Sequence, residues 1–485
     1  MTATGWLAIG ATIASLLGSG LDPASLVLLA SAFGVAVAGV RAAGGARPPR
    51  IRMLVATALG TLAIAIRLAL AAGSPPTLAP LPEGSGAWDA TVTTISSPRD
   101  GAQVATLTLD PTPASEREGL RAGRSSVAVA ATLPRFPAIE PGDEVRVDGR
   151  VEPPPDGPYG DYLRRIGVAG TIRSRSLAVI GRHEDAGARL EALRRMAGDA
   201  LGAALPEPEA GLAAGIVIGL RDRVDRDLAA DFTTVGASHV VAISGWNIAI
   251  VAATIAALAG RLGRRRRSIL LVVAIVGYVL FAGASASVVR AAVMAGVVLV
   301  ARESGRAGRA TTALGWAVAL LLLADPDLVL DAGFQLSTLA TGGILAWATP
   351  WTERLRRVAG GGLPGWLAES LGVSLAAQAA TLPIVLLTFG RLALVSPIVN
   401  LAIVPLVAPA MAAAMVALAG GLIAIAGGPG LVATLAGLPA WALLTAMCTV
   451  IRAAADLPFA NVSFGPPWTM VAGATSAVVV LGARP

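Results

Sequence analysis

The sequence has 485 residues and a formal net charge of +7, and it is 55% hydrophobic but only 14% charged, with a mean hydropathy of +0.70. This composition excludes a soluble globular protein, and at about 20 apolar residues per crossing it leaves room for many membrane-spanning helices. Because the sequence has two histidines, one cysteine and no lysine, we expect no metal, no cofactor, no internal disulfide and no lysine-containing phosphate loop.

The positive charge is concentrated in short arginine-rich segments between apolar runs, at residues 41–52, 261–267, 302–309 and 354–357. Such clusters follow the positive-inside bias, which reports orientation in a membrane rather than nucleic-acid binding. We therefore expect a polytopic α-helical protein of the cell (inner) membrane with these segments in the cytoplasm.

Residues 1–73 are predicted to form N-terminal transmembrane helices, with apolar runs at 5–21, 24–40 and 53–72. The first run lacks a basic n-region and a small-residue cleavage site, so we interpret it as a retained span rather than a signal peptide. This count places the N-terminus inside and residue 75 outside.

Residues 74–186 are predicted to form an inserted, extracytoplasmic β domain, because the helical periodicity changes there to alternation. The alternating segments are 87–95, 103–110, 125–133 and 143–151, with 171–180 as a fifth candidate. Five short strands separated by turn residues favour a small OB-like β-barrel, and a small sandwich remains the alternative.

Residues 187–485 are predicted to form a second helical membrane domain. Residues 187–204 have an amphipathic pattern, which predicts a helix lying along the membrane surface. Gly211, Gly215 and Gly219 are spaced four apart, a pattern that lets helix backbones approach closely. Apolar spans then alternate with arginine loops, until the prolines beyond residue 390 leave the number of crossings undetermined.

The predicted helix 239–260 carries polar residues that a membrane helix rarely keeps, namely His239, Ser244, Gly245 and Asn247. These groups need protein or water partners, so the stretch either lines a path or makes a hydrogen-bonded helix contact. An intramembrane serine hydrolase is disfavoured, because five helical residues rotate Ser244 by about 140° away from His239 and no second histidine lies in a predicted span. We expect no enzyme.

Two later helices carry polar stripes along one face. The stripes are Asp331, Gln335, Thr338 and Gly342 on helix 331–349, and Ser370, Ser374, Gln378 and Thr381 on helix 366–389. We interpret them as walls of a hydrated route, with dry hydrogen-bonded packing as the alternative.

Arg290 lies inside an apolar segment, where an arginine costs about 2.5–3.5 kcal/mol on insertion scales and needs a partner. The expected topology puts Arg290 and Asp331 toward the outer side, so we predict that they approach each other or share a polar cavity. The alternative is that Arg290 meets a passing phosphate, which a guanidinium binds with two hydrogen bonds.

The order of these segments resembles the ComEC competence family. The motifs that carry the resemblance are PGDEVRVDGRV with PYGDYLRRIGVAGTIR, GLAAGIVIGLRDRV with TTVGASHVVAISGWNIAIV, GASASVVRAAVMAG, LLLADPDLVLDAGFQLSTLAT and QAATLPIVLLTFGRLALVSPIVNLAIVPL. The resemblance implies an inner-membrane channel component that passes single-stranded DNA into the cytoplasm during natural transformation. It also implies delivery by a pseudopilus and a surface DNA receptor, and uptake by a cytosolic ATP-driven helicase or translocase.

The residues carried over by position, with neighbours expected to line the channel, span the helical region. They are His239, Ser244, Asn247, Arg290, Asp331, Gln335, Ser337, Thr338, Ser374, Gln378, Pro383 and Asn400. A transporter of another small or anionic substrate on the same scaffold remains the alternative function, and homo-oligomerisation remains open.

This sequence departs from the family's pattern in two places. The family usually has Ser-Gly-Leu-His where this chain has Ser244-Gly245-Trp246-Asn247, and asparagine can hydrogen-bond but cannot titrate near neutral pH. Many members also end in a metallo-β-lactamase-like domain, whereas this sequence has no HxHxDH cluster, so we expect no dinuclear metal site. Because aromatic residues are scarce in 74–186, we expect the β domain to be a weak DNA guide or a structural cap.

Overall fold

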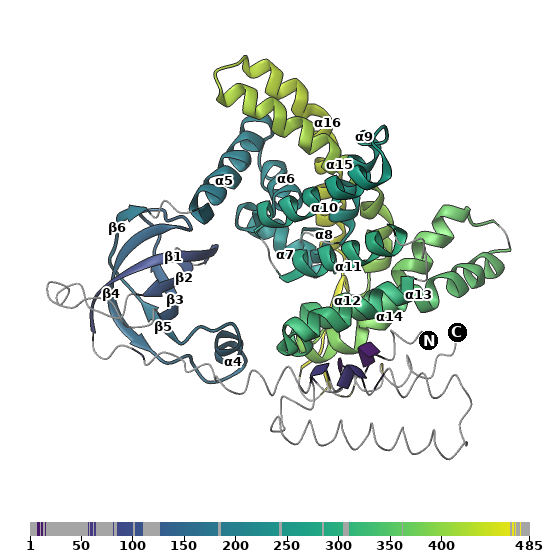
Figure 1. Cartoon of the computed structure of the whole chain (residues 1–485), viewed down its shortest axis with the longest axis horizontal. Coiled ribbons are helices and arrows are strands. Elements are labelled where there is room, and N and C mark those ends of the chain that lie inside the picture. The colour runs from purple at the N-terminus through teal and green to yellow at the C-terminus, as the bar shows by residue number, and fades with distance from the viewer. Residues whose placement is uncertain are drawn as a thin grey trace.

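The computed structural model describes residues 85–99, 102–109, 127–182, 186–241, 245–283, 286–303, 310–360 and 362–465, with scattered residues before 82 and after 467. A β-barrel lies beside a larger helical part (Figure 1). The spans predicted at 5–21, 24–40, 53–72 and 467–483 fall for the most part outside the described residues.

The β domain is a closed barrel, which decides between the barrel and the sandwich. Its strands are β1 (Ser85–Arg99), β2 (Ala102–Leu109), β3 (Val127–Pro134), β4 (Asp143–Glu152), β5 (Gly170–Arg173) and β6 (Leu177–Arg182), with helix α4 (Pro158–Arg165) between β4 and β5. Hydrogen bonds run in the order β1-β2-β3-β5-β4, and β1 pairs with β4 to complete the ring. Strands β3 and β5 are parallel, and β6 adds to β4 as a sixth strand.

The alternating sequence pattern builds the barrel core, because successive side chains of a strand point to opposite faces. Leu107, Val129 and Val145 are fully buried, and Trp88 is buried with its indole Nε1 donating to the Gly149 carbonyl at 3.0 Å. The single fifth strand predicted at 171–180 is wrong, because the segment forms β5 and β6 separated by a turn. The Ser174 hydroxyl makes that turn by donating to the Ser176 carbonyl at 2.6 Å.

The helical part begins with α5 (Ala186–Ala204), α6 (Glu209–Val217), η1 (Arg221–Arg223), α7 (Arg226–Thr234), α8 (Ser238–Val241), α9 (Gly245–Leu258) and α10 (Arg264–Phe281). It continues with α11 (Ala286–Glu303), α12 (Ala310–Ala324), η2 (Pro326–Leu330), α13 (Ala332–Val358), α14 (Gly365–Phe389), α15 (Ser396–Ile425) and α16 (Gly430–Ala455). The short strands β7 (Arg391–Ala393) and β8 (Asn461–Ser463) pair with each other.

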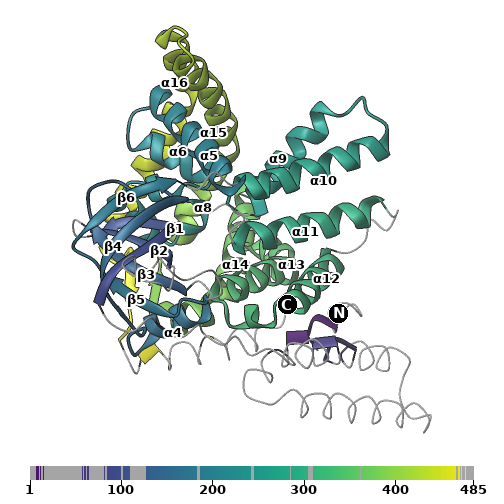
Figure 2. The ribbon, with the colours of Figure 1, turned by 60° about the vertical axis from the view of Figure 1, so that its left-hand side comes forward.

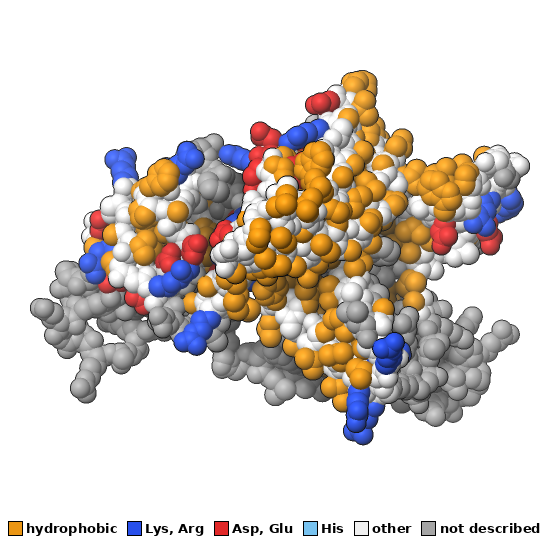
Figure 3. All heavy atoms as spheres, turned by 90° about the horizontal axis from the view of Figure 1, so that it is seen from above, with side chains coloured by type: hydrophobic (Ala, Val, Ile, Leu, Met, Phe, Trp, Pro, Cys, Tyr) orange, Lys and Arg blue, Asp and Glu red, His pale blue; other side chains and the backbone are white. Residues whose placement is uncertain are grey.

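Among the described residues, α14, α15 and α16 are the helices long and apolar enough to cross a membrane. Hydrophobic side chains cover much of the visible face of the helical part, whereas charged side chains are more frequent over the barrel (Figure 3). These helices support the prediction of a membrane protein, and the number and direction of crossings stay predictions.

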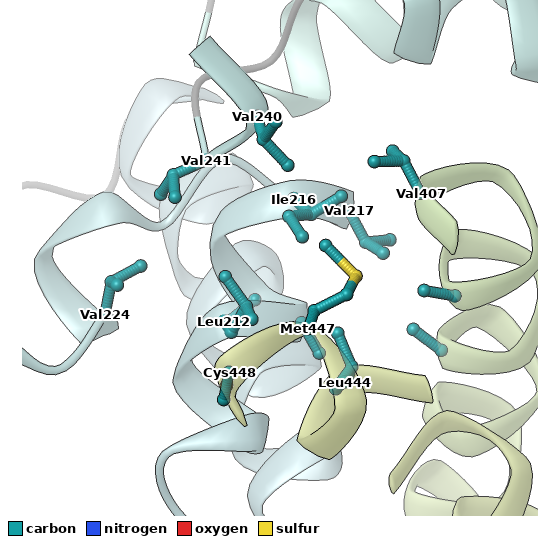
Figure 4. Packing of buried hydrophobic residues seen from close by; sticks show 14 of the residues in the cluster. Leu212, Ile216, Val217, Val224, Val240, Val241, Val407, Leu444, Met447 and Cys448 are labelled. Carbon is teal, nitrogen blue, oxygen red and sulfur yellow. The ribbon is translucent and has the colours of Figure 1, made fainter. Parts of the chain in front are cut away.

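The main core of the helical part surrounds α6, between α7, α15 and α16. Leu212 and Ile216 of α6 point toward Leu444 and Met447 of α16 (Figure 4). Because lipid tails are as apolar as these side chains, close packing rather than removal from water stabilises this core.

Helix α5 packs against α15, and its predicted place along the membrane surface stays a prediction. Ala197, Ala200 and Leu201 are buried, and a Cβ atom placed on Gly421 of α15 would lie only 1.8 Å from the Ala200 carbonyl oxygen. Of the apolar stripe that the pattern predicts, Ala197 and Leu201 pack against protein, whereas Leu193 is 51% exposed.

Candidate functional site

A short buried helix, α6, lies at the centre of the helical part, and the chain after it doubles back along it. All nine residues of α6 are buried. A Cβ atom on Gly211 would lie 2.2 Å from the Arg223 carbonyl oxygen, and one on Gly215 would lie 2.8 Å from Cγ2 of Val224. Gly219, with φ of +85°, makes the reversal. The four-residue glycine spacing therefore serves a returning segment rather than a neighbouring helix.

The C-terminal end of α6 is capped by side chains from α9 and α10. Asn247 Nδ2 of α9 donates to the Ile216 carbonyl at 3.1 Å, and the Tyr278 hydroxyl of α10 donates to the Val217 carbonyl at 3.2 Å. In the described part of the chain no backbone amide reaches either carbonyl. Because the last carbonyls of a helix have no intrahelical donor, Asn247 and Tyr278 remove the main cost of ending α6 inside the protein.

The N-terminal end of α6 carries two carboxylates that sequence analysis missed. Glu207 accepts a hydrogen bond from the Gly211 amide at 3.1 Å, and the buried Glu209 accepts one from the Thr445 hydroxyl of α16 at 2.8 Å. Carboxylates are favourable there because the helix dipole is positive at that end. The PEPE segment before an apolar run was the signal that could have revealed them.

Arg290 of α11 and Asp331 are partners, as the sequence predicted. Arg290 Nη1 lies 3.2 Å from Asp331 Oδ1, and the same carboxylate oxygen accepts the Phe334 amide at 2.6 Å, which makes Asp331 the N-cap of α13. Arg290 is buried, whereas the Asp331 side chain is 46% exposed. The pair therefore joins α11 to the start of α13 while leaving the carboxylate open on one side.

A second polar group lies in the seam between α14 and α15. Asn400 Nδ2 donates to the Ser374 hydroxyl at 3.4 Å and to the Ser396 hydroxyl at 3.3 Å, and Gln378 Nε2 donates to the Ala393 carbonyl at 3.3 Å. The amide oxygens of Gln378 and Asn400 are buried and have no donor within the part of the chain that the structure describes. A buried acceptor without a donor is costly, so these two atoms mark a place where water or a polar ligand would be stabilised.

The two predicted polar stripes do not face each other across the α13–α14 contact. Small residues build that contact, because a Cβ atom on Gly343 would lie 2.4 Å from the Ala380 Cβ. Ser374 and Gln378 turn instead toward α15 and β7, while Gln335 Nε2 donates to the Val329 carbonyl of η2 at 2.7 Å. The stripes therefore lie on different sides of the helix pair, and their role in lining a channel stays a prediction.

The remaining predicted residues lie at separate positions along the helical part. His239 lies on α8 with an exposed side chain, and Ser337 and Thr338 are half-buried on α13. Ser244 falls outside the described residues, between α8 and α9, and the helix predicted over 239–260 ends at Leu258. Within the described residues, no three His, Cys, Asp or Glu side chains are grouped so that they could hold a metal ion.

Comparison with known proteins shows which family the chain belongs to. The Competence protein family matches residues 216–484, which is more than half of the chain. The chain belongs to the Competence protein family. A similar protein is ComE operon protein 3 of Bacillus subtilis (strain 168), which is 29% identical over 279 residues, covering 55% of this chain and 34% of that relative. No solved structure matches.

The part of the chain that matches the Competence protein family begins inside α6, at Ile216. It therefore includes the capped end of α6, the Arg290–Asp331 pair and the α14–α15 seam, whereas the barrel and α5 precede it.

An ion cluster that sequence analysis missed connects α5 to η1. The Glu191 carboxylate pairs with Arg194 and Arg195, and Arg195 Nη1 also lies 2.7 Å from Asp222. Arg194 lies beside Gly283 in the turn between α10 and α11, since a Cβ atom there would be 3.0 Å from its Nη2. The cluster holds α5 against both η1 and that turn.

Asp231 of α7 lies near the C-terminal end of α16. Burial raises the pKa of the Asp231 carboxyl, the Asp456 carboxylate raises it further, and Arg452 opposes both effects. The folded chain therefore favours the protonated form of Asp231 more than an unfolded chain would.

Proposed function

We propose that the chain is the membrane component through which single-stranded DNA enters the cytoplasm during natural transformation. The observation that carries this proposal is membership of the Competence protein family across the helical part of the chain. The similar protein of Bacillus subtilis is named as a product of a ComE operon, and the chain spans about a third of its length, so the activity of the whole relative is here a hypothesis.

The buried polar groups of the helical part support a polar route. An unpaired amide oxygen inside a membrane domain is costly unless water or a ligand donates to it. Gln378 and Asn400 each present such an oxygen in the α14–α15 seam. Both water and the amino groups of nucleobases are hydrogen-bond donors, so the seam is the first place to look for contact with a passing strand.

Arg290 has two candidate roles on this proposal. Its contact with Asp331 makes it a positioning residue for the start of α13. Its Nε is buried with no acceptor among the described residues, which favours an additional anionic or polar partner. A phosphate of the passing strand would satisfy it, because guanidinium groups bind phosphate with parallel hydrogen bonds.

We also propose that the barrel is OB-like and lies outside the cytoplasm, as a weak guide or a cap. Trp88 is buried in the barrel core and cannot stack with a base, whereas Phe136 is 73% exposed with the Arg135 guanidinium 5.6 Å from its ring centre. Tyr159 of α4 is also exposed, at 55%. Two exposed aromatics, of which one lies beside a cation, support weak rather than tight binding, since OB folds bind single strands through several stacked aromatics and a basic groove.

On this proposal the chain is a channel component rather than an enzyme, and it acts with partner proteins. A pseudopilus and a surface DNA receptor would deliver the strand, and a cytosolic ATP-driven helicase or translocase would pull it. The multi-pass topology, and assembly of more than one copy, belong to the same proposal.

The test measures labelled DNA entering cells of a strain that lacks this gene, after complementation with chain variants of matched membrane abundance. A double variant Gln378→Leu/Asn400→Leu should reduce uptake at least tenfold, whereas Thr434→Val should not, because the Thr434 hydroxyl bonds within its own helix. Undiminished uptake without the gene would end the proposal. In that case the transporter of a small or anionic substrate becomes the better hypothesis.

A further inference from the structure

The tip of the α9–α10 hairpin gathers arginines without any acidic residue nearby in sequence. Arg261, Arg265, Arg266 and Arg267 lie within seven positions, and residues 245–283 contain no Asp or Glu. In the described part of the chain none of these four guanidinium groups has an ion-pair partner. Figure 2 shows the hairpin projecting away from the rest of the helical part.

The arginines are not explained by the stability of α10. Arg265, Arg266 and Arg267 occupy its first turn, where cations oppose the helix dipole, and the N-cap Gly263 supplies no side chain to the first amides. Several uncompensated positive charges on one turn repel each other. An anionic partner from outside the chain would relieve both effects.

The surface next to these arginines is apolar and uncovered. Ile269, Leu270, Val273 and Val276 of α10 are each at least 40% exposed. A nucleic acid would match the arginines but would leave this face bare, whereas a phospholipid matches both, with its phosphate on the guanidinium groups and its acyl chains along α10.

We propose that the α9–α10 tip is a binding site for anionic phospholipid headgroups. The arginines lie at headgroup depth and the apolar face of α10 contacts acyl chains. The site does not depend on DNA passage, so it goes beyond the proposed function. Arginines next to an anionic leaflet each strengthen binding by roughly fivefold, so three of them should confer a preference of about two orders of magnitude at low salt.

The test uses the full chain purified in a neutral detergent and titrated with phosphatidylglycerol or phosphatidylcholine, with bound lipid counted by native mass spectrometry. The wild-type chain should bind phosphatidylglycerol at least tenfold more tightly than phosphatidylcholine. The variant Arg265→Gln/Arg266→Gln/Arg267→Gln should lose that preference, and raising the salt concentration should weaken it in the wild type.

A matched control removes the same charge from the barrel. The exposed Arg150, Arg173 and Arg175 lie on strands and a turn of the barrel rather than at the start of an apolar helix, so Arg150→Gln/Arg173→Gln/Arg175→Gln should keep the preference. Equal loss in both triple variants would overturn the proposal, because it would reduce the effect to net charge. Displacement of the lipid by equimolar inorganic phosphate or by an oligothymidine strand would also overturn it, in favour of a free-anion or a nucleic-acid site.

Discussion

The hydroxyl of Tyr278 should stabilise the chain by capping α6, and removing that one oxygen tests the idea. Tyr278→Phe keeps the ring in place but leaves the Val217 carbonyl without its donor. A buried acceptor left unpaired costs about 1–3 kcal/mol in proteins generally, whereas hydrogen bonds within membrane proteins average about 0.6 kcal/mol. Because this contact is only partly buried, we expect a loss of about 1 kcal/mol.

Asn247→Leu should cost more than Tyr278→Phe, because Asn247 is 1% exposed and its bond to Ile216 is fully buried. The double variant should cost less than the sum, since both donors hold the same helix end and the loss of one loosens the other. The free energy of unfolding is measured by titrating the full chain from mild detergent micelles into sodium dodecyl sulfate, with circular dichroism as the readout.

The matched control is Tyr159→Phe, because Tyr159 is exposed on the barrel domain. That variant should unfold with the wild-type free energy. If Tyr278→Phe were equally silent, its hydroxyl would contribute nothing to the stability of α6 and the reasoning would fail. If the two cap variants were additive within about 0.3 kcal/mol, the two donors would act independently and the expected coupling would be refuted.

Three further predictions concern single residues. Gly211→Ala should destabilise the chain by about 2 kcal/mol or more, because its Cβ would overlap the Arg223 carbonyl. Gly202→Ala on α5, where an added Cβ meets no atom within 4 Å, should instead stabilise the chain by up to about 1 kcal/mol. The free energies of unfolding of both glycine variants are measured by the same titration. Asp331→Ala should cost about 1 kcal/mol more than Asp331→Asn, because asparagine keeps the N-cap of α13 while both lose the ion pair; equal losses in unfolding free energy would contradict the capping role. Since the pKa of Asp231 is raised in the folded chain, ionisation opposes folding, so stability is lost as pH rises through the folded pKa. Asp231→Asn should therefore raise the melting temperature at pH 7, and the gain should vanish below the unfolded pKa of about 3.8; a gain that does not change with pH would refute the assignment.

Local pattern was enough to predict the elements that depend on neighbours in sequence. Alternation predicted four of the barrel strands, because strand side chains repeat every two residues. The predicted helix 366–389 matches α14 almost residue for residue, since a long apolar run bounded by glycine and proline leaves few alternatives. The need of a buried arginine for a partner was also enough to pair Arg290 with Asp331.

The partners of α6 could not be predicted, because they depend on contacts between distant segments. The spacing of Gly211 and Gly215 predicts a close backbone approach, but only the fold decides that the approaching backbone is Arg223–Val224. Likewise, an asparagine within an apolar segment predicts that Asn247 makes a buried hydrogen bond. Only the tertiary structure shows that its acceptor is the Ile216 carbonyl at the end of α6.

Composition and periodicity by themselves determined that this is a membrane protein with an inserted β domain, because apolar content and side-chain repeat are properties of the chain alone. Tertiary structure decided where the polar stripes of α13 and α14 point. Each helix presents its small residues to the other, so close packing turns Ser374 and Gln378 toward α15 and Gln335 toward η2. A helical repeat specifies which residues share a face, but the packing of small residues against each other decides what that face meets.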